Sequence, residues 1–253
     1  MDFKINSKLD FPESILLGFI KNFTTEGKIL SDGTRNCIKI FSWQNRSVAI
    51  KSFKIPNFYN AVIYRYFRKS KAKRSFEYAI FLSENNIGTP APIAYFENYS
   101  FLGLKDSYYV SENLECDLTF RELVKIPDFP EHEAILRQFT QFCYQLHEKG
   151  IEFKDHSPGN TLIKKNEQGL YDFFLVDLNR MNFHEKMPFE LRMKNLCRLT
   201  PKQEMIVVMS NEYAKVSGES EKLIFETLWK YTSEFQYRFF RKKRLKKKFL
   251  FWK

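Results

Sequence analysis

The sequence predicts an α+β fold of two lobes, a small antiparallel sheet with one long helix followed by a mainly helical lobe. Residues 37–41 and 47–53 alternate apolar and polar side chains, and turn-forming residues separate the two stretches. Residues 60–84 contain no Gly or Pro, which favours a helix. From residue 187 onward the pattern is mostly helical. Because strands come first and most helices follow, we expect a sheet lobe and then a helical lobe.

The remaining elements follow from alternation and from helix-stop signals. A Pro near its start and Gly150 at its end predict a second helix over residues 130–149. Short apolar runs predict further strands over residues 28–30, 92–97, 107–114, 161–164 and 171–177. We therefore expect a first lobe over residues 1–114, a second lobe over 115–237 and a basic aromatic tail over 238–253.

Composition excludes several classes of protein. Of the 253 residues 43% are hydrophobic and 28% are charged, which provides for a packed interior and argues against a disordered chain. No apolar stretch approaches the roughly 18 residues of a membrane-spanning helix. Residues 1–10 lack the apolar centre of a signal peptide, so we expect a cytoplasmic protein. The four cysteines include no CxxC pair and are expected to be free thiols.

The positive charge is concentrated in the tail, from Arg238 to Lys253. These residues include nine Lys or Arg and no acid, whereas the other 237 residues carry 32 basic and 30 acidic groups. Large apolar residues end the tail, which favours adsorption to an anionic membrane surface, at up to about 1 kcal/mol for each cation. A second basic stretch covers residues 65–74. A solvated tail remains an alternative, and the contiguous terminal aromatic residues favour a membrane over nucleic acid.

Three polar residues provide the groups that phosphoryl transfer needs. Asp155 and Asn160 lie five positions apart in a loop that contains Pro and Gly, between the predicted helix and a strand. Asp177 follows the next apolar strand. One carboxylate can orient the attacking hydroxyl and accept its proton, while an amide and a second carboxylate bind magnesium. The alternative for Asp155 and Asn160 is a turn in which each side chain bonds its own backbone.

These residues resemble the catalytic loop and metal-binding Asp of the protein-kinase-like phosphotransferases. The sequence motif Lys-Asp-x-Ser-Pro-Gly-Asn, residues 154–160, is similar to that of the lipopolysaccharide kinases, which phosphorylate Kdo or heptose sugars of the inner core. Upstream, Val-Ala-Ile-Lys ending at Lys51 matches the kinase strand whose Lys contacts the phosphates of ATP. The resemblance covers roughly residues 27–183. It implies that Glu77 on the following helix pairs with Lys51, with Glu84 as the second choice and an exposed surface charge as the alternative for Glu77.

The sequence also departs from the kinase pattern. The glycine-rich loop is reduced to Gly27 and Gly33, so the expected phosphate cradle runs over residues 31–35, with Arg35 adding charge. Asp177 is followed by Leu-Asn instead of Phe-Gly, and no Ala-Pro-Glu occurs downstream. These departures argue against a protein kinase with a phosphorylated activation loop.

The resemblance implies a kinase that uses ATP and Mg²⁺ on a lipid-anchored sugar acceptor, peripheral at the inner face of the cytoplasmic membrane. In this interpretation Asp155 is catalytic, Asn160 and Asp177 bind the metal, and Lys51, Glu77, Gly33 and Arg35 contact the nucleotide. Two alternatives stay open, a protein Ser/Thr kinase of the same fold and a non-catalytic membrane or nucleic-acid adaptor. An adaptor does not require Lys51, Asp155, Asn160 and Asp177, so the presence of all four argues against that alternative.

Overall fold

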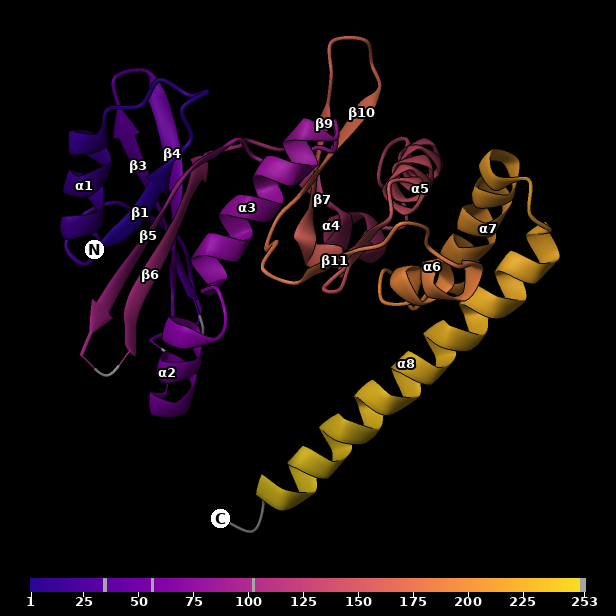
Figure 1. The fold of residues 1–253 in the computed structure, drawn as a ribbon. Helices are drawn as coiled ribbons and strands as arrows, with labels where there is room; N and C mark the ends of the chain where they lie inside the picture. The colour runs from indigo at the N-terminus through magenta and orange to yellow at the C-terminus, as the bar shows by residue number, and fades with distance from the viewer. Residues whose placement is uncertain (34–35, 56, 102, 251–253) are drawn as a thin grey trace. The chain divides into compact units, whose positions relative to one another are not determined.

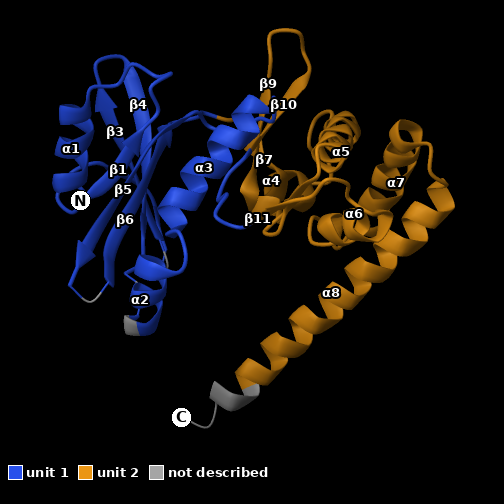
Figure 2. Cartoon of the chain, in the orientation of Figure 1, with its two compact units in different colours: residues 1–115, 175–180 blue, residues 116–174, 181–253 orange. Residues whose placement is uncertain are grey.

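The chain consists of two compact units, each with its own core (Figure 2). The computed structural model describes residues 1–33, 36–55, 57–101 and 103–250. Unit 1 comprises Met1–Glu115 together with Leu175–Arg180, and unit 2 comprises Cys116–Phe174 together with Met181–Lys253. The short segment Leu175–Arg180 therefore belongs to the unit of the N-terminal sheet, although the residues on both sides of it belong to unit 2.

Unit 1 is built on a six-stranded antiparallel sheet with the strand order β1-β5-β6-β4-β3-β2 (Figure 1). Its strands are β1 (Asp2–Ile5), β2 (Lys28–Asp32), β3 (Asn36–Trp43), β4 (Arg46–Phe53), β5 (Pro92–Ser100) and β6 (Gly103–Glu112). Short connections place β3 beside β4 and β5 beside β6, because consecutive strands joined in this way lie side by side.

The two faces of this sheet pack against different helices. Val48 and Ile50 on β4 join the core cluster that includes Leu16 of α1 (Glu13–Lys21). Phe53 belongs to a second cluster with Phe76 of α3 (Lys71–Glu84). Because successive side chains of a strand point to opposite faces, odd-numbered residues of β4 share the α3 face.

The helix predicted over residues 60–84 is in fact two helices, α2 (Phe58–Tyr66) and α3. Ser70 separates them, because its buried hydroxyl accepts a hydrogen bond from the Lys73 amide at 3.1 Å and so forms the N-cap of α3. A capping Ser offers the backbone an alternative to continuing a helix, even where no Gly or Pro occurs. The strand β1 and the helix α1 were not predicted either.

Unit 2 is mainly helical, with two small sheets. The helices are α4 (Phe120–Lys125), α5 (His132–Glu148), α6 (Phe189–Leu196), α7 (Gln203–Ser217) and α8 (Glu221–Leu250). Strands β7 (Leu118–Thr119), β9 (Thr161–Lys165) and β10 (Tyr171–Leu175) form one sheet, and β8 (Ile151–Phe153) pairs with β11 (Met181–Phe183). The predicted helix over residues 130–149 is confirmed as α5, and the α+β class is confirmed by the sheet of unit 1 and the helices of unit 2.

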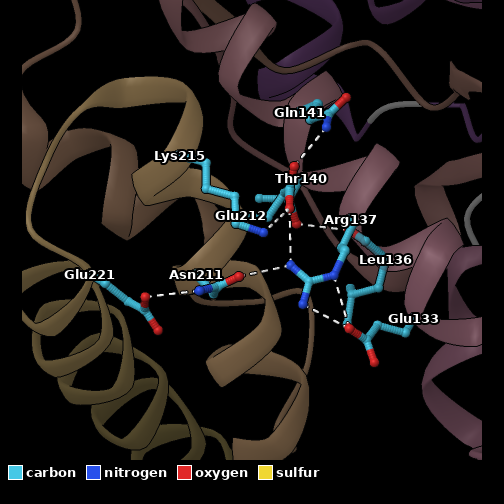
Figure 3. Close-up of polar contacts among 9 residues, drawn as sticks. All are labelled: Glu133, Leu136, Arg137, Thr140, Gln141, Asn211, Glu212, Lys215 and Glu221. Carbon is cyan, nitrogen blue, oxygen red and sulfur yellow. Dashed lines mark hydrogen bonds and ion pairs between the residues drawn. The ribbon is translucent and has the colours of Figure 1, made fainter.

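A polar network joins α5 to α7 within unit 2 (Figure 3). Arg137 donates to Glu133 on its own helix and to Asn211 and Glu212 on α7, at 2.7–3.0 Å. Gln141 donates to the second carboxylate oxygen of Glu212 at 2.7 Å. Burial opposes ionisation of Glu212, but the hydrogen bonds from Gln141 and Arg137 hold its pKa below the usual value. Since every oxygen of this buried carboxylate has a partner, the network fixes the packing of α5 on α7.

Candidate active site

In unit 1 the structure brings Lys51 and Asp177 together. Lys51 lies on β4, on the same face as Phe53, and its side chain is 13% exposed. Its Nζ donates to Oδ1 of Asp177 at 2.5 Å and lies 5.3 Å from the centre of the Phe53 ring. Two residues that the sequence singles out for the same chemistry thus form one ion pair.

Three hydrogen bonds attach the segment that carries Asp177 to the rest of unit 1. The amide of Leu175 donates to the Gly88 carbonyl at 2.9 Å, and the Thr89 hydroxyl donates to the Leu175 carbonyl at 2.9 Å. Arg74, buried on α3, donates to the Asn179 carbonyl at 2.7 Å. Asp177 is therefore held on both sides by the scaffold that carries Lys51.

The backbone of Asp177 adopts a left-handed conformation with φ of 61°. Asp tolerates this region better than most residues do, and strained positions of this kind gather at functional sites. Asn179 Nδ2 also donates to Oδ1 of Asp177, at 2.7 Å. The ion pair with Lys51 and this amide together orient the Asp177 carboxylate.

The expected pair between Lys51 and Glu77 differs from what the structure shows. Glu77 lies on α3, where its two carboxylate oxygens accept from Lys69 Nζ at 2.9 and 2.8 Å. Lys69 directly precedes the N-cap of α3 and reaches the helix face that carries Glu77, while Lys51 is paired with Asp177. Gly33 lies in the turn after β2, where its amide donates to the Asn36 carbonyl at 3.0 Å. Arg35 lies outside the described residues.

In unit 2 the loop after β8 brings Asp155 and Asn160 together. Pro158–Asn160 form a single 3₁₀ turn. Asn160 Nδ2 donates to the main-chain carbonyl of Asp155 at 2.8 Å, which fixes the spacing of the two residues. The Asn160 amide nitrogen is thereby engaged inside the loop, and its Oδ1 is the side-chain atom with the chemistry of a metal ligand.

Two buried histidines and Asn195 form a hydrogen-bonded cluster at this loop. Asn195 on α6 donates through Nδ2 to the Phe153 carbonyl at 2.9 Å. Its Oδ1, which can only accept, lies 3.2 Å from His156 Nδ1 and 3.3 Å from His147 Nε2. Both of these ring nitrogens must therefore carry protons. His147 Nδ1 is then an acceptor for the Tyr213 hydroxyl, at 2.9 Å.

The histidine cluster makes the stability of the protein dependent on pH. Burial lowers the pKa of His147 to about 3 and that of His156 to about 4. An unfolded chain protonates both near pH 6.5, so between pH 6.5 and 4 it binds protons that the folded chain does not. We expect the free energy of unfolding to fall with decreasing pH in this window, by up to about 1.4 kcal/mol per pH unit for each histidine.

Urea unfolding at pH 7.5 and pH 5.5 measures this loss. A His147→Gln/His156→Gln variant, where it folds, should lose the part of the pH dependence that these rings contribute, whereas His132→Gln removes an imidazole outside the cluster and serves as the control. A wild-type protein equally stable at both pH values would contradict the assignment of two neutral buried histidines.

Sequence reasoning missed two arginines beside the loop. Arg198 donates to the Lys154 carbonyl at 2.9 Å, and its guanidinium lies 3.7 Å from Asp155 Oδ1. Arg121 on α4 lies over Gly159, where an added Cβ would come within 2.2 Å of its Nη2. Arg198 is 44 residues from its loop partner in sequence, and no motif marks it. Only the fold brings it beside Asp155.

Gly150, which leads into β8 and the loop, cannot accept a side chain. Its φ is +68°, and an added Cβ would lie 1.8 Å from the carbonyl oxygen of His184. The Gly150 carbonyl accepts from the His184 amide at 2.8 Å, so the two strands cannot separate without losing this bond. We expect Gly150→Ala to reduce the free energy of unfolding by about 3 kcal/mol.

Chemical denaturation of wild type and Gly150→Ala measures this effect. Gly18→Ala is the matched control, because Gly18 lies in α1 with no atom within 4 Å of an added Cβ. This control should raise stability slightly, by up to about 1 kcal/mol. Equal stability of Gly150→Ala and wild type would show that β8 tolerates a shift away from His184.

The oxygen donors of the two units are of the kind that binds magnesium. Asp177 offers a carboxylate and Asn160 offers an amide oxygen, and Mg²⁺ prefers such hard ligands. Among the described residues no group of three or more His, Cys, Asp or Glu side chains is placed to hold a metal.

The antiparallel sheet crossed by α3, followed by a mainly helical part, is a protein-kinase-like fold. The structure is similar to that of WaaP in complex with acyl carrier protein, with a TM-score of 0.59 and 16% sequence identity. The match covers 89% of this chain and 92% of that chain. No protein-family model matches the sequence, and no curated protein matches it. Since 1383 chains of solved structures match, the likeness shows the fold and does not by itself assign a substrate.

Proposed function

We propose that this protein is an ATP- and Mg²⁺-dependent phosphotransferase that phosphorylates a sugar hydroxyl of the lipopolysaccharide inner core, Kdo or heptose. The observation that carries the proposal is the ion pair of Lys51 with Asp177, residues 126 positions apart in sequence. The kinase pattern assigns one to the phosphates and the other to the metal, and they lie 2.5 Å apart on one scaffold.

Each residue has a distinct role in the proposed reaction. Lys51 binds the phosphates of ATP, and Asn160 and Asp177 hold Mg²⁺. Asp155 aligns the acceptor hydroxyl and accepts its proton as the oxygen bonds to the γ-phosphorus. The bond from that phosphorus to the bridging oxygen breaks, and ADP leaves. Bound Mg²⁺ would neutralise charge on the phosphates.

The position of Arg198 favours the hypothesis that the acceptor carries negative charge near the reacting hydroxyl. Its guanidinium lies 3.7 Å from Asp155 and its side chain is 39% exposed, so it can bind a carboxylate or phosphate at little desolvation cost. Kdo carries a carboxylate, and phosphorylated sugars carry phosphates. This is the chemistry that the resemblance to the lipopolysaccharide kinases implies.

The position of α8 supports a lipid-anchored acceptor at the inner face of the cytoplasmic membrane. The basic residues from Arg238 onward continue α8 without a break as far as Leu250. Phe235, just before them, packs its ring 5.1 Å from the guanidinium of Arg198. The basic helix therefore begins next to the catalytic loop of its own unit. None of the helices among the described residues is long and apolar enough to cross a bilayer.

Deleting residues 238–253 should weaken binding to anionic vesicles and leave nucleotide binding intact. The tail supplies nine cations, each of which contributes up to about 1 kcal/mol near an anionic surface, while Lys51 and Asp177 lie in unit 1. Vesicle sedimentation and nucleotide titration measure the two effects. Equal vesicle binding by the truncated and full-length proteins would exclude this role of the tail.

A panel of acceptors tests the substrate class. Wild-type protein with Mg-ATP should phosphorylate Kdo-lipid A or a heptose-bearing core lipid in preference to a generic protein with exposed Ser and Thr. Labelling of the protein substrate alone would favour a protein Ser/Thr kinase. Failure to bind ATP would favour a non-catalytic adaptor.

A further inference from the structure

Helix α2 exposes apolar side chains on its solvent-facing side, where helices of globular proteins normally carry polar groups. Tyr59, Ile63 and Tyr66 follow one another at i, i+4 and i+7 and are 77%, 42% and 64% exposed. Phe67, at the C-cap of α2, is 81% exposed. The opposite face of the helix is already used, since Ala61 is buried and lies against β6. An exposed apolar stripe at helical spacing marks an interaction surface.

The tip of the β5–β6 hairpin extends this stripe. Phe101 at the tip is 93% exposed. Arg65 of α2 donates to the Ser100 carbonyl at 2.5 Å, and its guanidinium lies 5.6 Å from the centre of the Tyr99 ring. The hairpin also fits closely against the helix, because a Cβ on Gly103 would lie 2.6 Å from the Ala61 backbone. Five residues, here called the α2 surface, therefore lie on two joined elements: Tyr59, Ile63, Tyr66, Phe67 and Phe101.

Positive charge lies beside the α2 surface. Residues 54–74 contain seven Lys or Arg and no Asp or Glu; Lys69 is paired with Glu77 and Arg74 is buried, whereas Lys54 and Arg68 are exposed. Lys54 and Lys71 also line a pocket of about 370 Å³ between α2 and the sheet, together with Asn57, Asn60 and Tyr64. Lysine ammonium, amide and phenol groups are suited to an anion such as a phosphate group.

We propose that the α2 surface is a membrane-docking site that binds an anionic lipid bilayer. The aromatic side chains enter the interface, the neighbouring cations contact headgroup phosphates, and the pocket beside Lys54 and Lys71 receives one headgroup. Amphipathic rings next to cations are typical of interfacial binding. Side chains as exposed as Phe67 and Phe101 can enter a bilayer without a partner of matching shape. This site goes beyond the proposed function, which places membrane contact at α8, because it gives unit 1 a contact of its own.

Vesicle partitioning of the full-length protein tests this site. We expect Tyr66→Ser/Phe67→Ser/Phe101→Ser to bind vesicles of equal parts phosphatidylglycerol and phosphatidylcholine about tenfold more weakly than wild type. A matched control, Leu170→Ser/Val207→Ser/Leu223→Ser, removes apolar residues of unit 2 that are 53%, 47% and 46% exposed. It should bind within about twofold of wild type. Without nucleotide or acceptor in the assay, the result does not depend on whether the protein transfers phosphate.

A second measurement reports on the hairpin tip itself, even if α8 dominates binding. Fluorescence of Phe101→Trp should be quenched by brominated phosphatidylglycerol more strongly than that of wild type, and Val207→Trp should show no added quenching. Unchanged partitioning of the triple variant together with no added quenching at position 101 would overturn the proposal. A second result would also overturn it: the wild type is a dimer, the triple variant is a monomer, and both bind vesicles equally. The α2 surface would then be a contact between two copies of the chain.

Discussion

Replacing Asp155 by Asn should lower the rate of phosphoryl transfer by about a thousandfold and leave ATP affinity unchanged. The amide has nearly the same shape as the carboxylate but cannot accept the hydroxyl proton, and general base catalysis contributes about 10²–10⁴-fold. The loop should keep its fold, since Asn160 bonds the main chain of Asp155 and not its carboxylate.

Steady-state kinetics and nucleotide titration of Asp155→Asn separate catalysis from binding. Asp172→Asn is the control, because Asp172 is an exposed carboxylate of β10 in the same unit. An effect confined to KM would assign Asp155 to acceptor binding. Undiminished turnover would mean that another group accepts the proton.

Replacing Asp177 by Asn should abolish the dependence of ATP binding on Mg²⁺ and reduce transfer by about 10²-fold or more. The change removes the carboxylate proposed to hold the metal, and it removes the anionic partner of Lys51, whose side chain is 13% exposed. Lys51→Met should weaken ATP binding both with and without Mg²⁺, because it removes a contact to the phosphates and keeps the metal ligand.

Nucleotide titrations with Mg²⁺ and with a chelator distinguish the two variants. Asp106→Asn, a change to another carboxylate of unit 1, should behave as wild type because Asp106 pairs with Asn98 on the sheet. If Asp177→Asn keeps the full effect of Mg²⁺ on ATP affinity, Asp177 is not a metal ligand.

The sequence predicts the sheet well where apolar and polar side chains alternate along a strand. Alternation in β4 predicts both the strand and the shared face of Lys51 and Phe53, because side chains of a strand repeat with period two. The break between α2 and α3 was not predicted, since it depends on the side chain of one capping residue, Ser70. Neither was α1, whose role becomes visible only in the core that it shares with the sheet.

The candidate site shows a similar division. Asp155, Asn160, Asp177 and Lys51 can be singled out from sequence because the roles proposed for them demand fixed residue types in a fixed order. The partner of Lys51 could not, since the pattern pairs Lys51 with Glu77 and only the tertiary structure shows its ion pair with Asp177. Nor did any local spacing identify Asn195, which reaches Phe153 from 42 residues away.

The proposed function is tested most directly by the transfer of labelled γ-phosphate from Mg-ATP to Kdo-lipid A, with wild type and Asp155→Ala compared side by side. It predicts a labelled lipid with wild type and only background with the variant. Absence of label with a wild-type protein that binds ATP would contradict the proposed acceptor. Equal labelling by both proteins would contradict the proposed catalytic site.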